Sequence, residues 1–340
     1  MKSELRDPLL PLEPPSPAGD GWGSAAALRL RGLLGLRQSG IVIPFVALFI
    51  VLSATSSHFL TGTNLLNVVN QQSSTLIPAA GETLVLVAGG LDLSIGSIYA
   101  LAGVTAAHFA LVTNPTFAIL LALLVGLVIG VTNGIITAVF RVNSLIATLA
   151  MAYVVTGIAG LATGGNIITD FNRPSFGDFA TTLFLRVRMS TWVMIFVVVV
   201  LGVLLARTTA GRYIYAAGGN PEAAQLAGVR VRRVQILAFA CSGTAAALGG
   251  VIDTSRVLSA QSNVGTALAF TVLAGIVVGG TSILGGRGAV WRSVIGVLFI
   301  ALVANGFNLL GANPLYETVV LGVLLVGAVA FDAWTRLRQG

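Results

Sequence analysis

The sequence predicts an all-α, polytopic helical membrane protein with about ten transmembrane helices. Two observations are compositional: 56% of the residues are hydrophobic and only 9% are charged, against about 25% charged residues in an ordinary soluble domain. The third is that apolar residues gather in segments of about 20, the length that a helix needs to cross a bilayer. The predicted segments cover residues 41–57, 65–88, 95–113, 116–139, 144–163, 191–206, 235–252, 267–284, 289–310 and 315–333.

The distribution of basic residues predicts how these helices are oriented. The chain has 19 lysine and arginine residues against 12 acidic ones, a net charge of +7. If the amino terminus is cytosolic, most basic residues fall in cytosolic connections, as the positive-inside rule requires. Both termini are then cytosolic, because the predicted number of crossings is even. The basic residues left on the outer side are Arg173, Arg186, Arg188 and Arg256.

The chain divides into a tail and a transmembrane domain. Residues 1–40 include five prolines and are predicted to form a flexible cytosolic tail. Because the apolar run begins only at Ile41, after a long polar extension, we expect no cleavable signal peptide. The transmembrane domain is predicted over residues 41–335, with a long cytosolic connection at residues 207–234.

The composition argues against several kinds of site. Cys241 is the single cysteine and the chain has two histidines, so we expect no disulfide framework and no metal site. Basic residues scattered between apolar runs do not make a nucleic-acid-binding face. Lys2 is the only lysine, whereas a P-loop needs a lysine inside G-x-x-x-x-G-K-[ST] to reach nucleotide phosphates. We therefore expect no ATPase site, no cofactor and no enzymatic activity in this chain.

A short helix is predicted inside the cytosolic connection, in the stretch GNPEAAQLAGV. Asn220 can cap its free amides, Pro221 suits the first turn, and Glu222 complements the positive end of the helix. Gly228 then closes it. A helix of this length is not stable alone in water, so either it packs against its own bundle or a cytosolic partner docks on it.

Glu82 is an ionisable residue inside the second apolar segment, where an unpaired charge costs several kcal/mol. Pro78 is expected to loosen this helix, and Gln71 belongs to a polar stretch just before it. One interpretation is a discontinuous helix that lines a watery passage. The other is that Glu82 forms a hydrogen bond with a neighbouring helix and fixes its packing.

A break between two helices is predicted directly after this segment. Gly89 and Gly90 are expected to end one helix, and Asp92 or Ser94 to cap the next. A carboxylate at that place meets the positive end of the helix dipole. Contact between Asp92 and a polar solute is the alternative.

Three stretches, in the same order, resemble the permease subunits of ABC importers. GNPEAAQLAGV resembles their EAA-x-x-x-G loop, GETLVLVAGGLDLSIGSIYALAG resembles the GG-[IL]-D-L-S-[VI]-G signature of the ribose-type monosaccharide permeases, and GGTSILGGRGAV resembles the second glycine-rich stretch of the same family. The similarity covers about residues 41–334. The signature residues are Glu82, Gly89, Gly90, Asp92, Ser94 and Gly96, and the loop residues that would couple to an ATPase are Asn220, Pro221, Glu222, Ala223, Ala224 and Gly228.

The resemblance implies a transport subunit of the bacterial cytoplasmic membrane that moves a ribose-type sugar. ATP and magnesium would be bound by partner ATPase subunits in the cytosol. An extracytoplasmic sugar-binding protein and a second permease copy, identical or related, would complete the assembly. The EAA-type loop would transmit the work of the ATPases to the helical bundle.

A sugar path needs weak polar contacts and aromatic faces along the bundle. Our candidates are Gln71, Asn133, Asn305, Phe270 and Phe307. The outer stretches 164–190 and 253–266 are either contacts for the binding protein or plain solvated loops; their charged residues are Asp170, Arg173, Asp178, Asp253 and Arg256. The alternative function is an ion-coupled secondary transporter of a small polar solute, in which Glu82 takes the ion.

Overall fold

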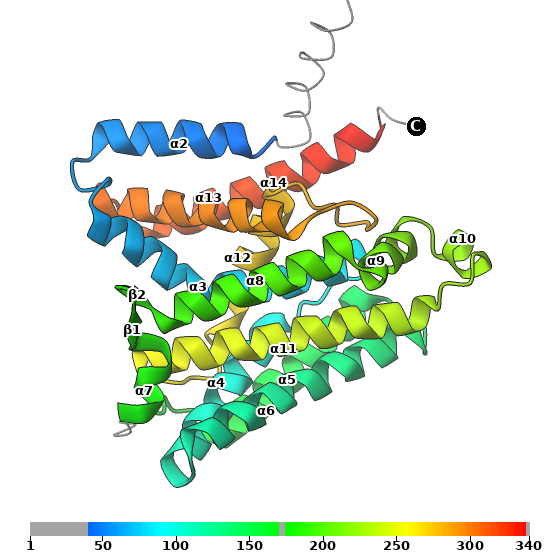
Figure 1. The fold of residues 1–340 in the computed structure, drawn as a ribbon, viewed down its shortest axis with the longest axis horizontal. Coiled ribbons are helices and arrows are strands. Elements are labelled where there is room, and N and C mark those ends of the chain that lie inside the picture. The colour runs from blue at the N-terminus through cyan, green and yellow to red at the C-terminus, as the bar shows by residue number, and fades with distance from the viewer. Residues whose placement is uncertain (1–39, 170–173, 338–340) are drawn as a thin grey trace, which may run out of the picture. The chain divides into compact units, whose positions relative to one another are not determined.

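The computed structural model describes residues 40–169 and 174–337, and nearly all of its regular structure is helical (Figure 1). Within this part of the chain, each predicted apolar segment contains one long helix. The tail predicted for residues 1–40 lies outside the described residues except for Gly40. The long helices are α2 (Val42–Thr55), α3 (Gly62–Val87), α4 (Ile95–Val112), α5 (Pro115–Ala138), α6 (Ser144–Thr163), α8 (Met189–Arg207), α11 (Val231–Val257), α12 (Gly265–Val278), α13 (Val290–Leu309) and α14 (Pro314–Leu337).

Six of these helices are long and apolar enough to cross a membrane: α4, α5, α6, α8, α11 and α13. Three shorter apolar helices accompany them, at Val42–Thr55, Gly265–Val278 and Leu315–Ala330. Helix α3 has the length, but its first half carries polar residues such as Asn70 and Gln71. A multi-pass arrangement follows from the six helices, whereas the number of ten crossings and the side of each terminus stay predictions.

Two helix boundaries differ from the prediction. Helix α12 ends at Val278, six residues before the predicted end at 284, because Gly279 and Gly280 follow and Gly280 takes a left-handed conformation with φ +89°. Helix α11 continues to Val257, past the predicted end at 252. Asp253 interrupts the apolar run there but does not interrupt the helix.

Short elements occupy the two long polar stretches. The stretch before α8 contains α7 (Pro174–Thr181) and a small antiparallel hairpin of β1 (Leu183–Phe184) and β2 (Val187–Arg188). The stretch between α8 and α11 contains α9 (Thr209–Gly219) and α10 (Pro221–Leu226). Figure 1 shows α9 and α10 at one end of α8 and α11, with α7 and the hairpin at the other.

Small residues let the central helices approach closely. Helix α11 packs against α3, α4 and α5. A Cβ atom added to Gly134 of α5 would lie 2.7 Å from the Cα of Ile236 on α11, so a glycine here lets the two backbones touch. Helices α4 and α12 begin beside each other, and a Cβ on Gly96 or Gly265 would overlap the carbonyl oxygen of the other residue.

Candidate functional site

The chain between α3 and α4 turns at two glycines. The Gly89 amide donates to the Leu86 carbonyl (3.0 Å) and the Gly90 amide to the Val85 carbonyl (2.9 Å), which ends α3. Gly89 has φ +83°, a conformation that other residues rarely adopt. Helix α3 itself runs unbroken through Pro78. The discontinuity that Pro78 was expected to create therefore lies farther along the chain, at the glycine pair.

Asp92 is fully buried in this break. Its Oδ1 accepts hydrogen bonds from the Ser94 amide (2.9 Å) and the Ser94 hydroxyl (2.6 Å). Asn133 of α5 donates from Nδ2 to the Ser94 hydroxyl at 2.8 Å. Asp92 thus orders the backbone that enters α4, with Ser94 as the residue before its first turn. Asp92 lines none of the described cavities.

Glu82 connects the break to α11. Its side chain is fully buried, with Oε1 accepting from the Asp92 amide (3.0 Å) and Oε2 from the Ser242 hydroxyl (3.1 Å). Both carboxylate oxygens are occupied by protein donors, and Glu82 lines none of the described cavities. This arrangement agrees with the packing interpretation of Glu82, not with a residue that lines a watery passage.

Replacing Glu82 with alanine should destabilise the protein. The Asp92 amide and the Ser242 hydroxyl would lose their buried acceptor, at about 1–3 kcal/mol for each unsatisfied group. We expect the thermal unfolding midpoint of Glu82→Ala in detergent to fall by several degrees. The midpoint of Glu82→Gln should fall less, because glutamine keeps one acceptor oxygen. Glu317→Ala, at a partly exposed position on α14, is the control. An unchanged midpoint for Glu82→Ala would contradict this assignment.

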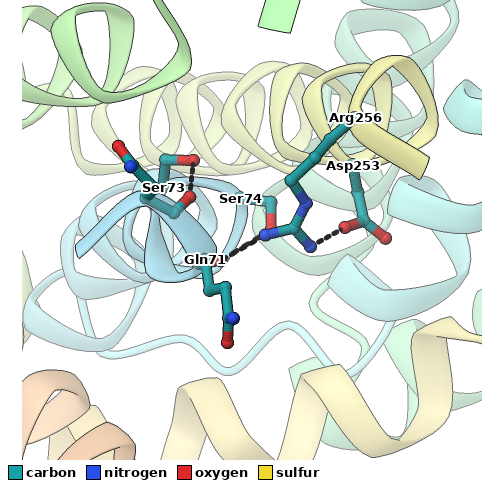
Figure 2. Close-up of polar contacts among 6 residues, drawn as sticks. Gln71, Ser73, Ser74, Asp253 and Arg256 are labelled. Carbon is teal, nitrogen blue, oxygen red and sulfur yellow. Dashed lines mark hydrogen bonds and ion pairs between the residues drawn. The ribbon is translucent and has the colours of Figure 1, made fainter. Parts of the chain in front are cut away.

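A polar cavity of about 640 Å³ lies among α3, α4, α11 and α12. Figure 2 shows the Arg256 guanidinium between the Gln71 carbonyl and the Asp253 carboxylate. Arg256 Nη1 donates to that carbonyl at 3.1 Å, and Arg256 Nη2 forms an ion pair with Asp253. The cavity is lined by Gln71, Gln72, Ser74, Thr75, Tyr99, Arg188, Asp253, Arg256, Val257, Val264, Ala267, Leu268 and Thr271.

The residues predicted for a sugar path do not gather at one place. Gln71 lines the polar cavity, whereas Asn133 belongs to the buried group around Asp92. Asn305 exchanges side-chain hydrogen bonds of 2.9 and 3.1 Å with Asn64. Phe270 lines a separate cavity of about 190 Å³, and Phe307 is half-buried outside the described cavities.

The outer charged residues separate in the same way. Asp170 and Arg173 lie outside the described residues, and Asp178 is exposed on α7. Asp253 and Arg256, expected in an outer stretch, instead lie in the last turns of α11 and face the cavity. The signal available in the sequence was their spacing of three residues, which places both side chains on one face if the helix continues.

The predicted cytosolic helix is present as α10. The Asn220 side chain accepts from the Ala223 amide (2.9 Å), and Pro221 occupies the first turn. Ala224 is buried against the bundle, whereas Leu226 is 91% exposed. Gly228 has φ +85° and follows the end of the helix. Helix α10 therefore packs on its own chain through Ala224 and leaves Leu226 uncovered, beside the exposed Glu222 and Gln225.

Helix α9 joins α10 to two glycine-rich breaks, the first at Gly89–Gly90 between α3 and α4 and the second at residues 279–289 between α12 and α13. Its Gly218 packs so closely on the end of α3 that an added Cβ would overlap the Val87 carbonyl and lie 2.8 Å from the Gly286 amide. That amide also donates to the Val87 carbonyl at 2.9 Å, so both breaks meet here.

Tyr215 makes a second contact between α9 and the later break. Its hydroxyl donates to the Gly288 carbonyl at 2.7 Å. Burial raises the pKa of Tyr215 above its ordinary value, an effect that Arg292 opposes. The phenol therefore stays protonated, as a donor must, at neutral pH.

Known proteins match the chain over most of its length. It is 39% identical over 259 residues to the ribose import permease protein RbsC of Bacillus subtilis, which covers 75% of this chain and 80% of that protein. It is 37% identical over 258 residues to the protein of the same name from Haemophilus influenzae, with 75% and 80% covered. The L-arabinose ABC transporter permease protein AraH of Azospirillum brasilense is 35% identical over 287 residues, with 83% of each chain covered.

No solved structure matches. A family profile described as "Branched-chain amino acid transport system / permease component" matches residues 64–329, which include both glycine-rich breaks and the segment from α9 to α10. With six helices that are long and apolar enough to cross a membrane, this is a multi-pass membrane protein. The chain belongs to this family of transport-system permeases.

Proposed function

We propose that the chain is the permease subunit of an ABC importer that moves a ribose-type monosaccharide across the bacterial cytoplasmic membrane. ATP hydrolysis takes place in cytosolic partner subunits, which bind the ATP and magnesium. An extracytoplasmic binding protein delivers the sugar, and a second permease copy, identical or related, completes the path. The bundle crosses the membrane ten times with both termini in the cytosol.

The observation that carries this proposal is the position of α9 and α10. Helix α10 is a short helix with an uncovered apolar residue, Leu226, and only Asn220 separates it from α9. Helix α9 in turn rests on the first break through Gly218 and on the second through Tyr215. A partner that displaced α10 would therefore displace the contacts that hold both breaks.

A sugar is favoured over an amino acid as the solute. The family profile is described for branched-chain amino acid transport, but the relatives named above are a ribose permease and an arabinose permease. The stretch GGLDLS of this chain, residues 89–94, also matches the signature of the sugar permeases. The buried Asp92 of that stretch is used to shape the break before α4.

The test is uptake into liposomes that contain this chain with the ATPase and binding protein encoded beside it. We expect ATP-dependent accumulation of ribose or arabinose, no accumulation of leucine, and no transport when the catalytic glutamate of the ATPase is replaced by glutamine. The chain alone should accumulate nothing under an imposed proton or sodium gradient. Accumulation by the chain alone would favour the ion-coupled alternative and contradict the proposal.

A further inference from the structure

The polar cavity is formed by four helices. Gln71 and Thr75 come from the middle of α3, Tyr99 from the start of α4, Asp253 from the end of α11, and Thr271 from the middle of α12. Its volume of about 640 Å³ lies within the range of roughly 300–1,000 Å³ that small-molecule sites occupy. A smaller cavity of about 180 Å³ shares Asp253 and Tyr99 with it.

The ion pair is held in place yet not covered. Arg256 and Asp253 keep 18% and 24% of their side-chain surface exposed. The hydrogen bond from Arg256 to the Gln71 carbonyl ties the guanidinium to α3, as Figure 2 shows. Tyr99 contacts the side chains of Asp253 and Ser74. The pair therefore has a fixed orientation before any solute arrives, which lowers the entropy cost of binding.

The chemistry of the pair fits neighbouring hydroxyl groups. A carboxylate only accepts hydrogen bonds and a guanidinium only donates them, whereas each hydroxyl of a sugar does both. Hydrogen bonds to charged groups are roughly twice as strong as neutral ones, and the two opposite charges of the pair cancel each other. Gln71, Gln72, Thr75 and Thr271 add uncharged polar groups around the pair.

We propose that Asp253 and Arg256 bind the hydroxyl groups of the transported monosaccharide inside the permease. This inference deepens the proposed function and rests on it. It differs from a contact for the binding protein, because both side chains line a partly open cavity that Gln71 and Tyr99 also line. Arg188 of β2 lies on the same wall and contributes a further positive charge.

The first experiment measures sugar uptake by the complete transporter in liposomes, at a saturating concentration of ribose-loaded binding protein. Asp253→Asn and Arg256→Gln should each lower the initial rate about tenfold or more, because each removes a charge-assisted hydrogen bond. Glu317→Gln on α14 is the matched control outside the cavity, and its rate should stay near that of the wild type.

The second experiment detects sugar at the site directly. Gln72 lines the cavity and Cys241 is the single native cysteine. In a Cys241→Ala background, ribose during turnover should slow the labelling of a Gln72→Cys thiol by a water-soluble maleimide about fivefold, as expected for an occupied small-molecule site. Adding Asp253→Asn should remove that protection. A substitution that only weakened the fold would not remove sugar-dependent protection in correctly assembled transporter.

The outcomes separate this inference from the proposed function. If the wild-type complex accumulates ribose or arabinose but neither variant lowers uptake and ribose gives no protection, the inference is wrong and the proposed function stands. If the wild-type complex accumulates neither sugar, the proposed function fails and this inference fails with it. Protection by ribose together with reduced uptake in both variants supports it.

Discussion

Replacing Gly218 with valine should lower the rate of ATP-driven sugar uptake about a hundredfold or more. Overpacking of a backbone contact costs about 1–3 kcal/mol and would force the backbone of α9 away from the end of α3. An added Cβ would overlap the Val87 carbonyl, lie 2.9 Å from the Ala88 carbonyl carbon and lie 2.8 Å from the Gly286 amide. These three residues belong to the two breaks. Helix α9 could then no longer rest on both at once, so motion of α10 would not reach the bundle.

Uptake and ATP hydrolysis should be measured on the same liposomes, after size-exclusion chromatography has shown that the variant is folded and assembled. Gly160→Val in α6 is the matched control, because a Cβ there meets nothing within 4 Å. Gly218→Ala adds the smallest possible side chain and should retain more assembled protein than Gly218→Val. If assembled Gly218→Val transports at the rate of the wild type, coupling through α9 is wrong.

The long helices could be predicted from the sequence because apolar runs of the right length carry their own signal. The turn at Gly89–Gly90 and the start of α10 at Asn220-Pro221 could also be predicted, since both depend on residues within a few positions of one another. Helix α9 was not predicted. Thr208 caps it, but its sequence TAGRYIYAAGG contains three glycines and no long apolar run, and it becomes a helix against the ends of α3 and α8.

The candidate site was harder to predict, because it depends on which helices lie beside one another. Gln71 and Arg256 are far apart in sequence, and nothing local indicates that the guanidinium of one reaches the carbonyl of the other. Glu82 was recognised as unusual, but a choice between a watery passage and a packing contact required knowledge of Ser242 on α11. Asn133 was chosen as a polar residue of the path and is enclosed beside Ser94.

Replacing Gly265 with valine should prevent the protein from folding correctly. Gly265 begins α12 directly against Gly96, the second residue of α4, and a Cβ on either glycine would overlap the carbonyl oxygen of the other. Backbones in contact leave no flexible side chain that could move aside, so the helices themselves must separate. Overpacking of this kind costs about 1–3 kcal/mol or more, a large share of the roughly 5–15 kcal/mol that keeps a domain folded.

The measurement is the yield of monodisperse protein after detergent extraction, together with the thermal unfolding midpoint of what remains. Gly96→Val should behave like Gly265→Val, because the two glycines meet each other. Gly157→Val in α6 is the control, since a Cβ there has open space, and it should extract like the wild type. If Gly265→Val extracts and unfolds like the control, then α4 and α12 do not meet in the way this structure shows. In that case Tyr99 of α4 and Thr271 of α12 would not line the same cavity.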